Sequence, residues 1–241
     1  MLKFALKTVV YAVMPTAFAR VRSARAKQVT KAERTLGVRQ FAFAGTSADE
    51  TRKREYASYD QYVEHQGLKY SVMLERTGGN PTRALVVYRT KFWLRFRRLG
   101  KLLPKDATIV CAGARDGTEV EVWRDLGYTK AVGYDLNPGP GNSLVREGDF
   151  NHLPLGDASV DAVYSNCVDH AFDLDMMFTE ARRILKPGGF FLYDISLAEP
   201  GAFEAVEWDR PETALVTLLR YATSLIEVRR FRAWMQITAR R

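Results

Sequence analysis

Three features of the sequence predict an α/β domain with a doubly wound, mostly parallel sheet. From residue 107 onward, short apolar β-branched runs alternate with stretches of helical composition. The first run, Thr108–Ala112, ends in a turn with Gly113 and Gly117, and a helix-compatible stretch follows it. Two further apolar runs close the chain with no helix between them, as an antiparallel pair would. Strands separated by helices imply right-handed crossovers and hence parallel strands.

The boundaries of these elements follow from turn residues and caps. Asp173 or Asp175 is expected to cap a helix that begins near 174, and Gly188-Gly189 to turn into the next strand. The expected strands are about 107–112, 130–135, 144–147, 159–165 and 190–196, with the closing pair at 225–231 and 234–238. The expected helices include about 81–103, 118–126, 174–185 and 211–222.

The chain divides into an arm with a linker and one larger domain. The expected parts are the arm and linker at 1–54 and a domain at 55–241, the latter comprising a helical cap at 55–104 and an α/β core at 105–241. In the cap, Tyr59, Tyr62 and Gln66 stand at i, i+3 and i+7 and share one helix face. This stripe either packs the helix onto the core or forms a lid over a ligand, with Tyr59, Tyr62 and His65 on the substrate side.

Composition limits the classes of site. The 241 residues include two cysteines, too few for a disulfide framework. The three histidines and two cysteines lack the spacing of a metal site, so no metal is expected.

The formal charge of +8 belongs to the N-terminal arm. Residues 1–40 hold nine Lys and Arg side chains against one acid, Glu33, while the remaining residues are balanced. A neutral domain argues against a broad nucleic-acid surface. The arm is basic and amphipathic, and three roles stay open: an anionic membrane surface, a secretory signal ending at Ala17-Phe18-Ala19, or docking on its own domain or a second subunit. No stretch reaches the ~18 apolar residues of a membrane-spanning helix.

Candidate binding residues follow the expected strands, at the sheet edge where ligands of such folds lie. Asp135 stands 18 residues past Gly117, a spacing that suits a carboxylate accepting hydrogen bonds from ribose hydroxyls. Asp149 with Phe150 can bind an adenine amino group and pack on its ring, and Asn166 ends the strand expected beside the first. Each carboxylate could also serve only its own turn. Together the set indicates an adenosine site.

Two adenosine ligands suit such a sheet, a dinucleotide and S-adenosylmethionine (SAM). A pyrophosphate favours Gly-x-Gly-x-x-Gly at the start of a helix, whereas this turn reads Gly113-x-x-x-Gly117 with Arg115 in the middle. The turn therefore disfavours the dinucleotide and the nicotinamide oxidoreductase that would use it.

Residues 105–196 resemble the class I SAM-dependent methyltransferases, in the subfamily that includes quinone-biosynthesis methyltransferases. The resemblance lies in four motifs in order: Tyr134-Asp135, Gly148-Asp149, Ser159–Asn166 and Leu185–Leu192. It implies a seven-stranded Rossmann-like sheet and SAM as cofactor. The implied cofactor-binding residues are Cys111, Gly113, Arg115, Asp116, Gly117, Asp135, Leu136, Asp149, Phe150 and Asn166.

The first motif departs from the family pattern. Cys111 replaces the usual acid, and Arg115 replaces the middle glycine. Arg115 or Asp116 could hold the amino-acid end of SAM instead, Arg115 by pairing with its carboxylate. The other possibility is a degenerate site that binds weakly or not at all.

Methyl transfer is mostly a matter of positioning, and a hydroxyl acceptor also benefits from a base. The best candidate is His170, preceded by Asp169, because histidine titrates near pH 7; the alternative is that both only pack the loop. The resemblance thus predicts a SAM-dependent methyltransferase for a small-molecule, lipid-linked or polysaccharide-precursor acceptor, with methylation at oxygen. The alternatives are a non-catalytic SAM-fold protein that binds a membrane or partner through its arm and, less favoured, an RNA methyltransferase. A cytoplasmic location follows, with peripheral attachment to the inner membrane face.

Overall fold

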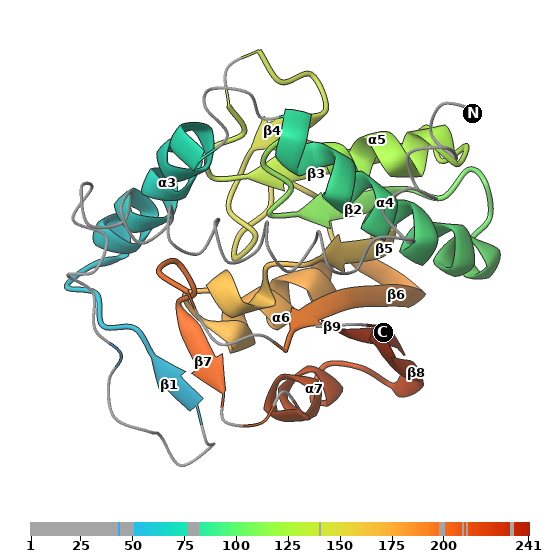
Figure 1. Ribbon diagram of the computed structural model, residues 1–241. Helices are drawn as coiled ribbons and strands as arrows, with labels where there is room; N and C mark the ends of the chain where they lie inside the picture. Colours follow the sequence, from blue (N-terminus) through green and yellow to red (C-terminus); the bar gives the residue numbers. More distant parts are fainter. Residues whose placement is uncertain are drawn as a thin grey trace.

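The computed structural model describes residues 43, 51–76, 82–139, 141–197, 201–208, 210, 212–231 and 234–241. Their centre is a seven-stranded sheet in the order β4-β3-β2-β5-β6-β9-β8 (Figure 1). The strands are β2 Ile109–Ala112, β3 Ala131–Asp135, β4 Val145–Glu147, β5 Val160–Ser165, β6 Leu185–Ser196, β8 Ser224–Phe231 and β9 Trp234–Arg240. The strands β2 to β6 and β8 run in one direction, and β9 runs in the opposite direction because it pairs antiparallel with both β6 and β8. The predicted sheet class is confirmed.

Helices cover both faces of the sheet because each central strand is apolar on both faces. In β2, Ile109 and Cys111 face one core, which also holds Phe96 and Trp123, while Val110 joins the other. The first core is covered by α4 Thr82–Leu99, η2 Gly100–Leu102 and α5 Thr118–Asp125, and the second by α6 Leu174–Ile184 and α7 Glu212–Leu219 (Figure 1).

Most predicted boundaries hold to within two or three residues, and Asp173 caps α6 by accepting a hydrogen bond from the Met176 N–H at 3.0 Å. Gly188-Gly189 was expected to precede a strand, but β6 already begins at Leu185. Its pairing with β5 shifts between Val160↔Leu185 and Ala162↔Phe190, so residues 186–189, which include both glycines, form an irregular bulge inside the strand.

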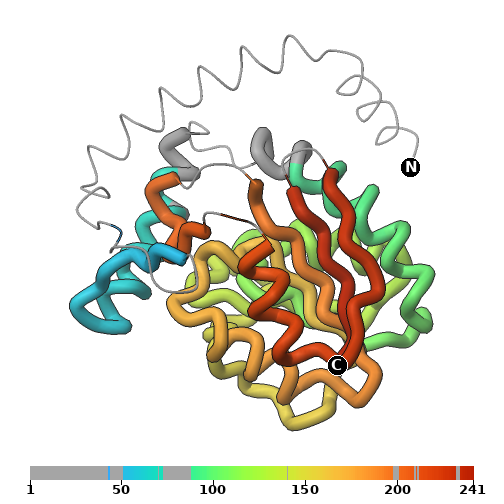
Figure 2. Tube along the Cα trace, turned by 90° about the horizontal axis from the view of Figure 1, so that it is seen from below, coloured from blue at the N-terminus to red at the C-terminus, as the bar shows by residue number. Residues whose placement is uncertain are grey.

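A small second sheet corrects the predicted linker at 41–54. β1 Thr51–Lys53 pairs antiparallel with β7 Val206–Trp208, so the end of that linker is a strand. No sequence pattern predicted β7. The pair carries the chain into α3 Tyr59–Arg76, and both β1 and α3 lie together at one side of the large sheet (Figures 1 and 2).

The basic arm at 1–40 lies outside the described residues. Among the helices that the structure does describe, none combines the length and apolar character that crossing a membrane requires.

Candidate active site

A cleft of about 660 Å³ opens above the carboxyl ends of β2, β3 and β5. It runs between α3, the N-terminal part of α5, α4 and the segment 201–204 that precedes β7. The predicted residues that line it are Tyr62, Gly113, Arg115, Asp116, Asp135, Leu136, Phe150, Asn166, Asp169 and His170. The fold therefore brings most of the sequence-predicted site into one space.

The turn after β2 requires glycine at two positions because of their backbone angles and their close contacts with neighbouring side chains. Gly113 and Gly117 have φ of +76° and +78°, which side chains rarely adopt. A Cβ on Gly113 would lie 2.1 Å from the Cys167 Sγ, and one on Gly117 would lie 2.9 Å from the Cβ of Leu144. The Gly113 and Ala114 N–H groups donate to the Tyr134 carbonyl at 2.7 and 3.2 Å and hold the turn against β3. Gly117 itself does not line the cleft.

Asp135 ends β3 at the cleft, as predicted. Its Oδ2 accepts a hydrogen bond from the Arg115 N–H at 3.0 Å, and its Oδ1 accepts one from the Asn137 N–H at 2.9 Å. The side chain is buried, yet each carboxylate oxygen can accept a second bond. The arrangement leaves acceptor capacity for a pair of hydroxyl groups in the cleft.

Arg115 places a guanidinium group at the cleft, and this group makes few hydrogen bonds within the described part of the chain. Its Nη2 donates to the Gln66 carbonyl at 3.5 Å, and its buried Nε has no hydrogen-bond partner among the described residues. A half-buried guanidinium whose buried Nε–H has no partner favours a ligand carboxylate. Beside it, burial raises the pKa of Asp116.

Asp149, which is predicted to bind adenine, already accepts hydrogen bonds within the chain through both of its carboxylate oxygens. Its Oδ1 accepts from the Asn151 N–H at 2.8 Å, and its Oδ2 accepts the Tyr59 hydroxyl. Asp149 does not line the cleft, although the neighbouring Phe150 does.

Cys111 lies in β2 and Cys167 follows the neighbouring strand β5, and of the two only Cys167 lines the cleft. Cys111 is buried in the core under α4 and α5, where burial raises the pKa of its thiol. Cys167 lines the cleft with its Sγ 3.2 Å from the Ser165 Oγ. Both thiols are free.

The predicted lid helix α3 both packs on the core and walls the cleft. The Tyr62 hydroxyl donates to the His170 carbonyl at 2.9 Å, and the Gln66 amide donates to the Phe203 carbonyl at 2.8 Å. His65 faces away from the cleft, with its Nδ1 2.9 Å from the Tyr56 hydroxyl and its ring stacked on Phe203. Burial lowers the pKa of His65 to about 4.

The predicted base His170 has both ring nitrogens engaged. Its Nδ1 lies 2.8 Å from the Phe203 carbonyl, and its Nε2 lies 2.7 Å from the Lys69 Nζ. Burial, with Lys69 next, holds the pKa of His170 well below its usual range. Burial and then Glu204 raise the pKa of Asp169 to about 7.

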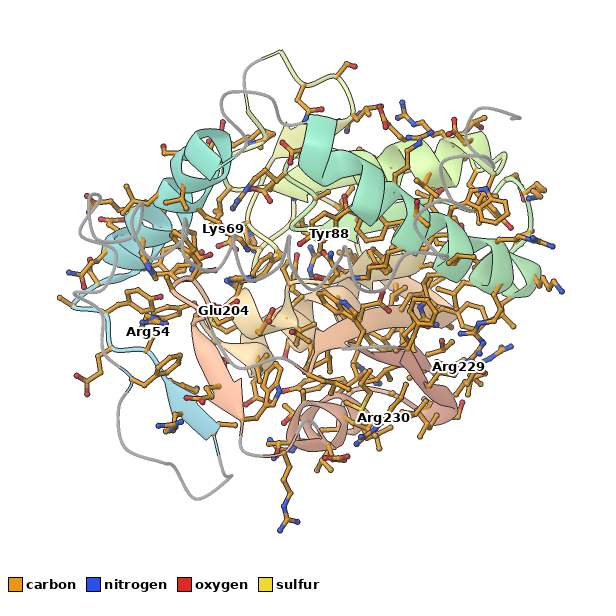
Figure 3. The ribbon with its side chains drawn as sticks, in the orientation of Figure 1. Arg54, Lys69, Tyr88, Glu204, Arg229 and Arg230 are labelled. Atoms are coloured by element: carbon orange, nitrogen blue, oxygen red, sulfur yellow. The ribbon has the colours of Figure 1, made fainter. Side chains whose placement is uncertain are left out.

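Two of these groups, Lys69 and Glu204, were not predicted (Figure 3). Lys69 follows Gln66 by three residues, so it lies on the same helix face as Tyr59 and Tyr62 and could have been found there. Glu204 carries no such signal, because it stands in an irregular segment.

The far end of the cleft is aromatic and was also missed. Phe92 of α4, Trp234 of β9 and the exposed Tyr88 line it. The Lys91 Nζ lies 3.2 Å from the centre of the Trp234 ring, and burial lowers the pKa of this lysine to about 8.

Comparison with known proteins agrees with this geometry. Residues 110–193 match the family model described as a methyltransferase domain. The chain is 32% identical over 91 residues to the dimethylglycine N-methyltransferase of Parasynechococcus marenigrum, covering 37% of this chain and 30% of that protein. It is 35% identical over 89 residues to the ubiquinone/menaquinone biosynthesis C-methyltransferase of a Caulobacter species, covering 36% and 31%.

An O-methyltransferase is also among the relatives. The malonyl-[acyl-carrier protein] O-methyltransferase of Yersinia pestis is 33% identical over 100 residues, covering 38% of this chain and 37% of that protein. The chain thus spans about a third of the length of these curated relatives.

A solved structure shows the same fold. The 1,6-didemethyltoxoflavin-N1-methyltransferase of Burkholderia thailandensis superposes with a TM-score of 0.57 at 20% identity, covering 84% of this chain and 96% of that chain. The match at 110–193 and the sheet order identify a methyltransferase domain with the class I fold, and SAM is the cofactor of that class.

Proposed function

We propose that the protein transfers a methyl group from SAM to an oxygen atom of a small-molecule, lipid-linked or polysaccharide-precursor acceptor. The observation that carries the proposal is one cleft that holds both the Asp135 carboxylate and the buried, unsatisfied Nε of Arg115. The carboxylate suits the ribose hydroxyls of SAM, and the guanidinium suits its amino-acid carboxylate. The residues present therefore fit the cofactor.

Each predicted binding residue then has a role in the proposal. Asp135 and Leu136 would hold the ribose, and Asp149 and Phe150 the adenine. The residues assigned to the amino-acid end of SAM are Cys111, Gly113, Arg115, Asp116, Gly117 and Asn166. Cys111 and Gly117 act there through the backbone turn that they support, since neither lines the cleft.

Bound SAM supplies an electrophilic methyl group on a positively charged sulfur. The chain contributes position: α3 walls the cleft through Tyr62, and the aromatic end at Phe92 and Trp234 offers an apolar surface to the acceptor. His170 and Asp169 are the residues proposed to take the proton of an acceptor hydroxyl, directly or through Lys69, whose Nζ lies 2.7 Å from the His170 Nε2.

The relatives named above methylate nitrogen, carbon and oxygen by their names, so they do not select the atom. Oxygen is proposed because the cleft holds proton-accepting groups that a hydroxyl acceptor needs. A cytoplasmic location, with the arm at 1–40 on the inner membrane face, is proposed with it, and the charge of that arm is the support.

Calorimetric titration with SAM and with its demethylated product tests the proposal. Wild type is expected to bind at micromolar concentration, and Asp135→Ala to lose at least tenfold in affinity through the lost ribose bonds, about 1.4 kcal/mol or more. Asp157→Ala is the matched control, because that exposed carboxylate pairs with Arg183 away from the cleft.

No binding by wild type at millimolar ligand would refute the proposal. Binding without transfer of labelled methyl to any acceptor pool would favour the alternative, a non-catalytic protein that binds SAM and uses its arm to reach a membrane or partner.

A further inference from the structure

Lys69 extends from α3 to the core and directly contacts the predicted base His170, although the sequence did not indicate it. Its Nζ lies 2.7 Å from the His170 Nε2, a bond between residues 101 apart in the sequence. Lys69 lines the cleft, and Figure 3 places it near Glu204, between α3 and β7.

The hydrogen-bond partners of His170 determine which of its ring nitrogens carries the proton. The Phe203 carbonyl can only accept, so the Nδ1 donates to it at 2.8 Å. In the neutral ring the Nε2 is then the acceptor, and the Lys69 Nζ is its donor. His170 therefore has no lone pair free for a proton from an acceptor while Lys69 stays in place.

Charged groups from several elements surround the Lys69 Nζ. One oxygen each of Asp169 and Glu204 and one nitrogen of His170 lie within 4.8 Å of one another. Arg115 faces Lys69 from the turn after β2, and Cys167 faces it from the end of β5. Burial, with Arg115 next, lowers the pKa of Lys69 although both carboxylates oppose this effect. Burial and Arg115 thus favour the neutral amine of Lys69, whereas the two carboxylates favour its ammonium form.

We propose that Lys69 is the proton acceptor of the reaction and that the methyl acceptor is a neutral hydroxyl compound with a flat apolar ring. The proposal rests on the proposed methyl transfer from SAM. In the step, the acceptor oxygen forms a bond to the methyl carbon, and the carbon–sulfur bond breaks with its electron pair left on sulfur. The hydroxyl proton moves to the neutral Lys69 Nζ, which becomes an ammonium between Asp169 and Glu204.

The residues that line the cleft support the proposal that the methyl acceptor has a flat ring. Beyond Lys69 the cleft is lined by Tyr88, Phe92 and Trp234, a group of aromatic rings, with the Lys91 Nζ over the Trp234 ring. A flat ring between them would direct its hydroxyl back toward the polar cluster.

The test separates a proton acceptor from a fixed charge. Lys69→Arg places a fixed positive charge there and can donate to His170, but it cannot take up a proton. With catechol as the hydroxyl probe, kcat is expected to fall by about 100-fold or more, the usual size of a lost base. With benzoate as probe, whose ring is flat and whose carboxylate has no proton to lose, kcat is expected to change by about threefold or less.

Two controls guard against simple misfolding. The affinity for SAM, measured by calorimetry, is expected to stay within about twofold in Lys69→Arg and in a second variant, Lys69→Gln, because Lys69 is not assigned to the cofactor. Lys186→Arg is the matched control, since that lysine pairs with Asp161 away from the cleft.

A readout without turnover completes the test. Trace acetylation with acetic anhydride across pH, followed by peptide mass spectrometry, is expected to give Lys69 a lower midpoint than Lys186. An equal midpoint would overturn the proposal, as would a fully active Lys69→Arg or a turnover that depends on a divalent cation. Failure of wild type to bind SAM would instead refute the proposed function and leave the acetylation result standing.

Discussion

Glu119 lies in the first turn of α5 with its carboxyl group at the cleft, and it is nearly fully buried. Burial raises its pKa from the ordinary 4.5 to about 8, against the opposing charge of Lys91. The carboxyl is therefore protonated at pH 7 in the folded protein and ionised in the unfolded chain. A neutral acid at this point adds a hydrogen-bond donor to the lining of the cleft.

The raised pKa of Glu119 makes the free energy of unfolding decrease as pH rises. Because the folded state holds the proton more tightly, stability due to Glu119 is complete below pH 4.5 and falls as pH rises toward 8. Glu119→Gln, which cannot ionise, is expected to match wild type at pH 4.5 and to exceed it by about 2–4 kcal/mol at pH 9. Urea unfolding at both pH values measures the difference, and a gap that does not widen with pH would contradict the assignment.

Helix α3 is the element that links the cap to the site. It contacts the core through the Tyr62 and Gln66 hydrogen bonds and through the Tyr59 hydroxyl on Asp149. The two readings of its aromatic stripe, packing and lid, therefore describe one helix, since the side chains that pack it also wall the cleft. Tyr59 holds the carboxylate oxygen that an adenine amino group would use.

Removing that hydroxyl is expected to favour the cofactor. Tyr59→Phe frees the Asp149 Oδ2, so the affinity for SAM is expected to rise by about threefold to tenfold, the range of one recovered charged hydrogen bond. Calorimetry measures it, with Tyr221→Phe as control, because the Tyr221 hydroxyl donates to Asp175 at 2.6 Å elsewhere on the surface. Weaker binding by Tyr59→Phe would show that the hydroxyl serves the ligand rather than Asp149.

At the scale of the whole molecule, charge and fold are separated along the chain. The excess of positive charge lies in residues 1–40, whereas the domain is neutral and carries the cleft. The proposed membrane role therefore depends on the arm alone, with each basic residue near an anionic surface contributing about 1 kcal/mol.

Vesicle binding tests this division. Full-length protein is expected to sediment with phosphatidylglycerol vesicles at low salt, and replacement of Arg20, Arg22, Arg25 and Lys27 by Gln to weaken binding by about tenfold or more. The matched control replaces four basic residues of the domain surface with Gln: Lys53, Lys105, Arg220 and Arg230. Equal loss in both variants would argue for a domain surface instead of the arm.

The sequence alone determined the α/β core. Its strands and helices alternate with clear turn residues, so β2, β3, β5 and α5 were located within two or three residues. Because the carboxyl ends of parallel strands meet at one edge, the same reasoning brought Asp135 and Asn166 together before any coordinates. Local pattern suffices where each element's own period identifies it.

The rest of the candidate site depends on long-range contacts that only the tertiary structure forms. β1 and β7 pair across more than 150 residues, and Lys69, Glu204 and Trp234 reach the cleft from three distant elements. It also gave His170 a lysine on its Nε2 and Asp149 a tyrosine on its Oδ2. These contacts depend on how elements pack rather than on the period of any one of them. The sequence thus specified the frame of the fold and most of the proposed cofactor site, while long-range packing determined which side chains surround the rest of the cleft.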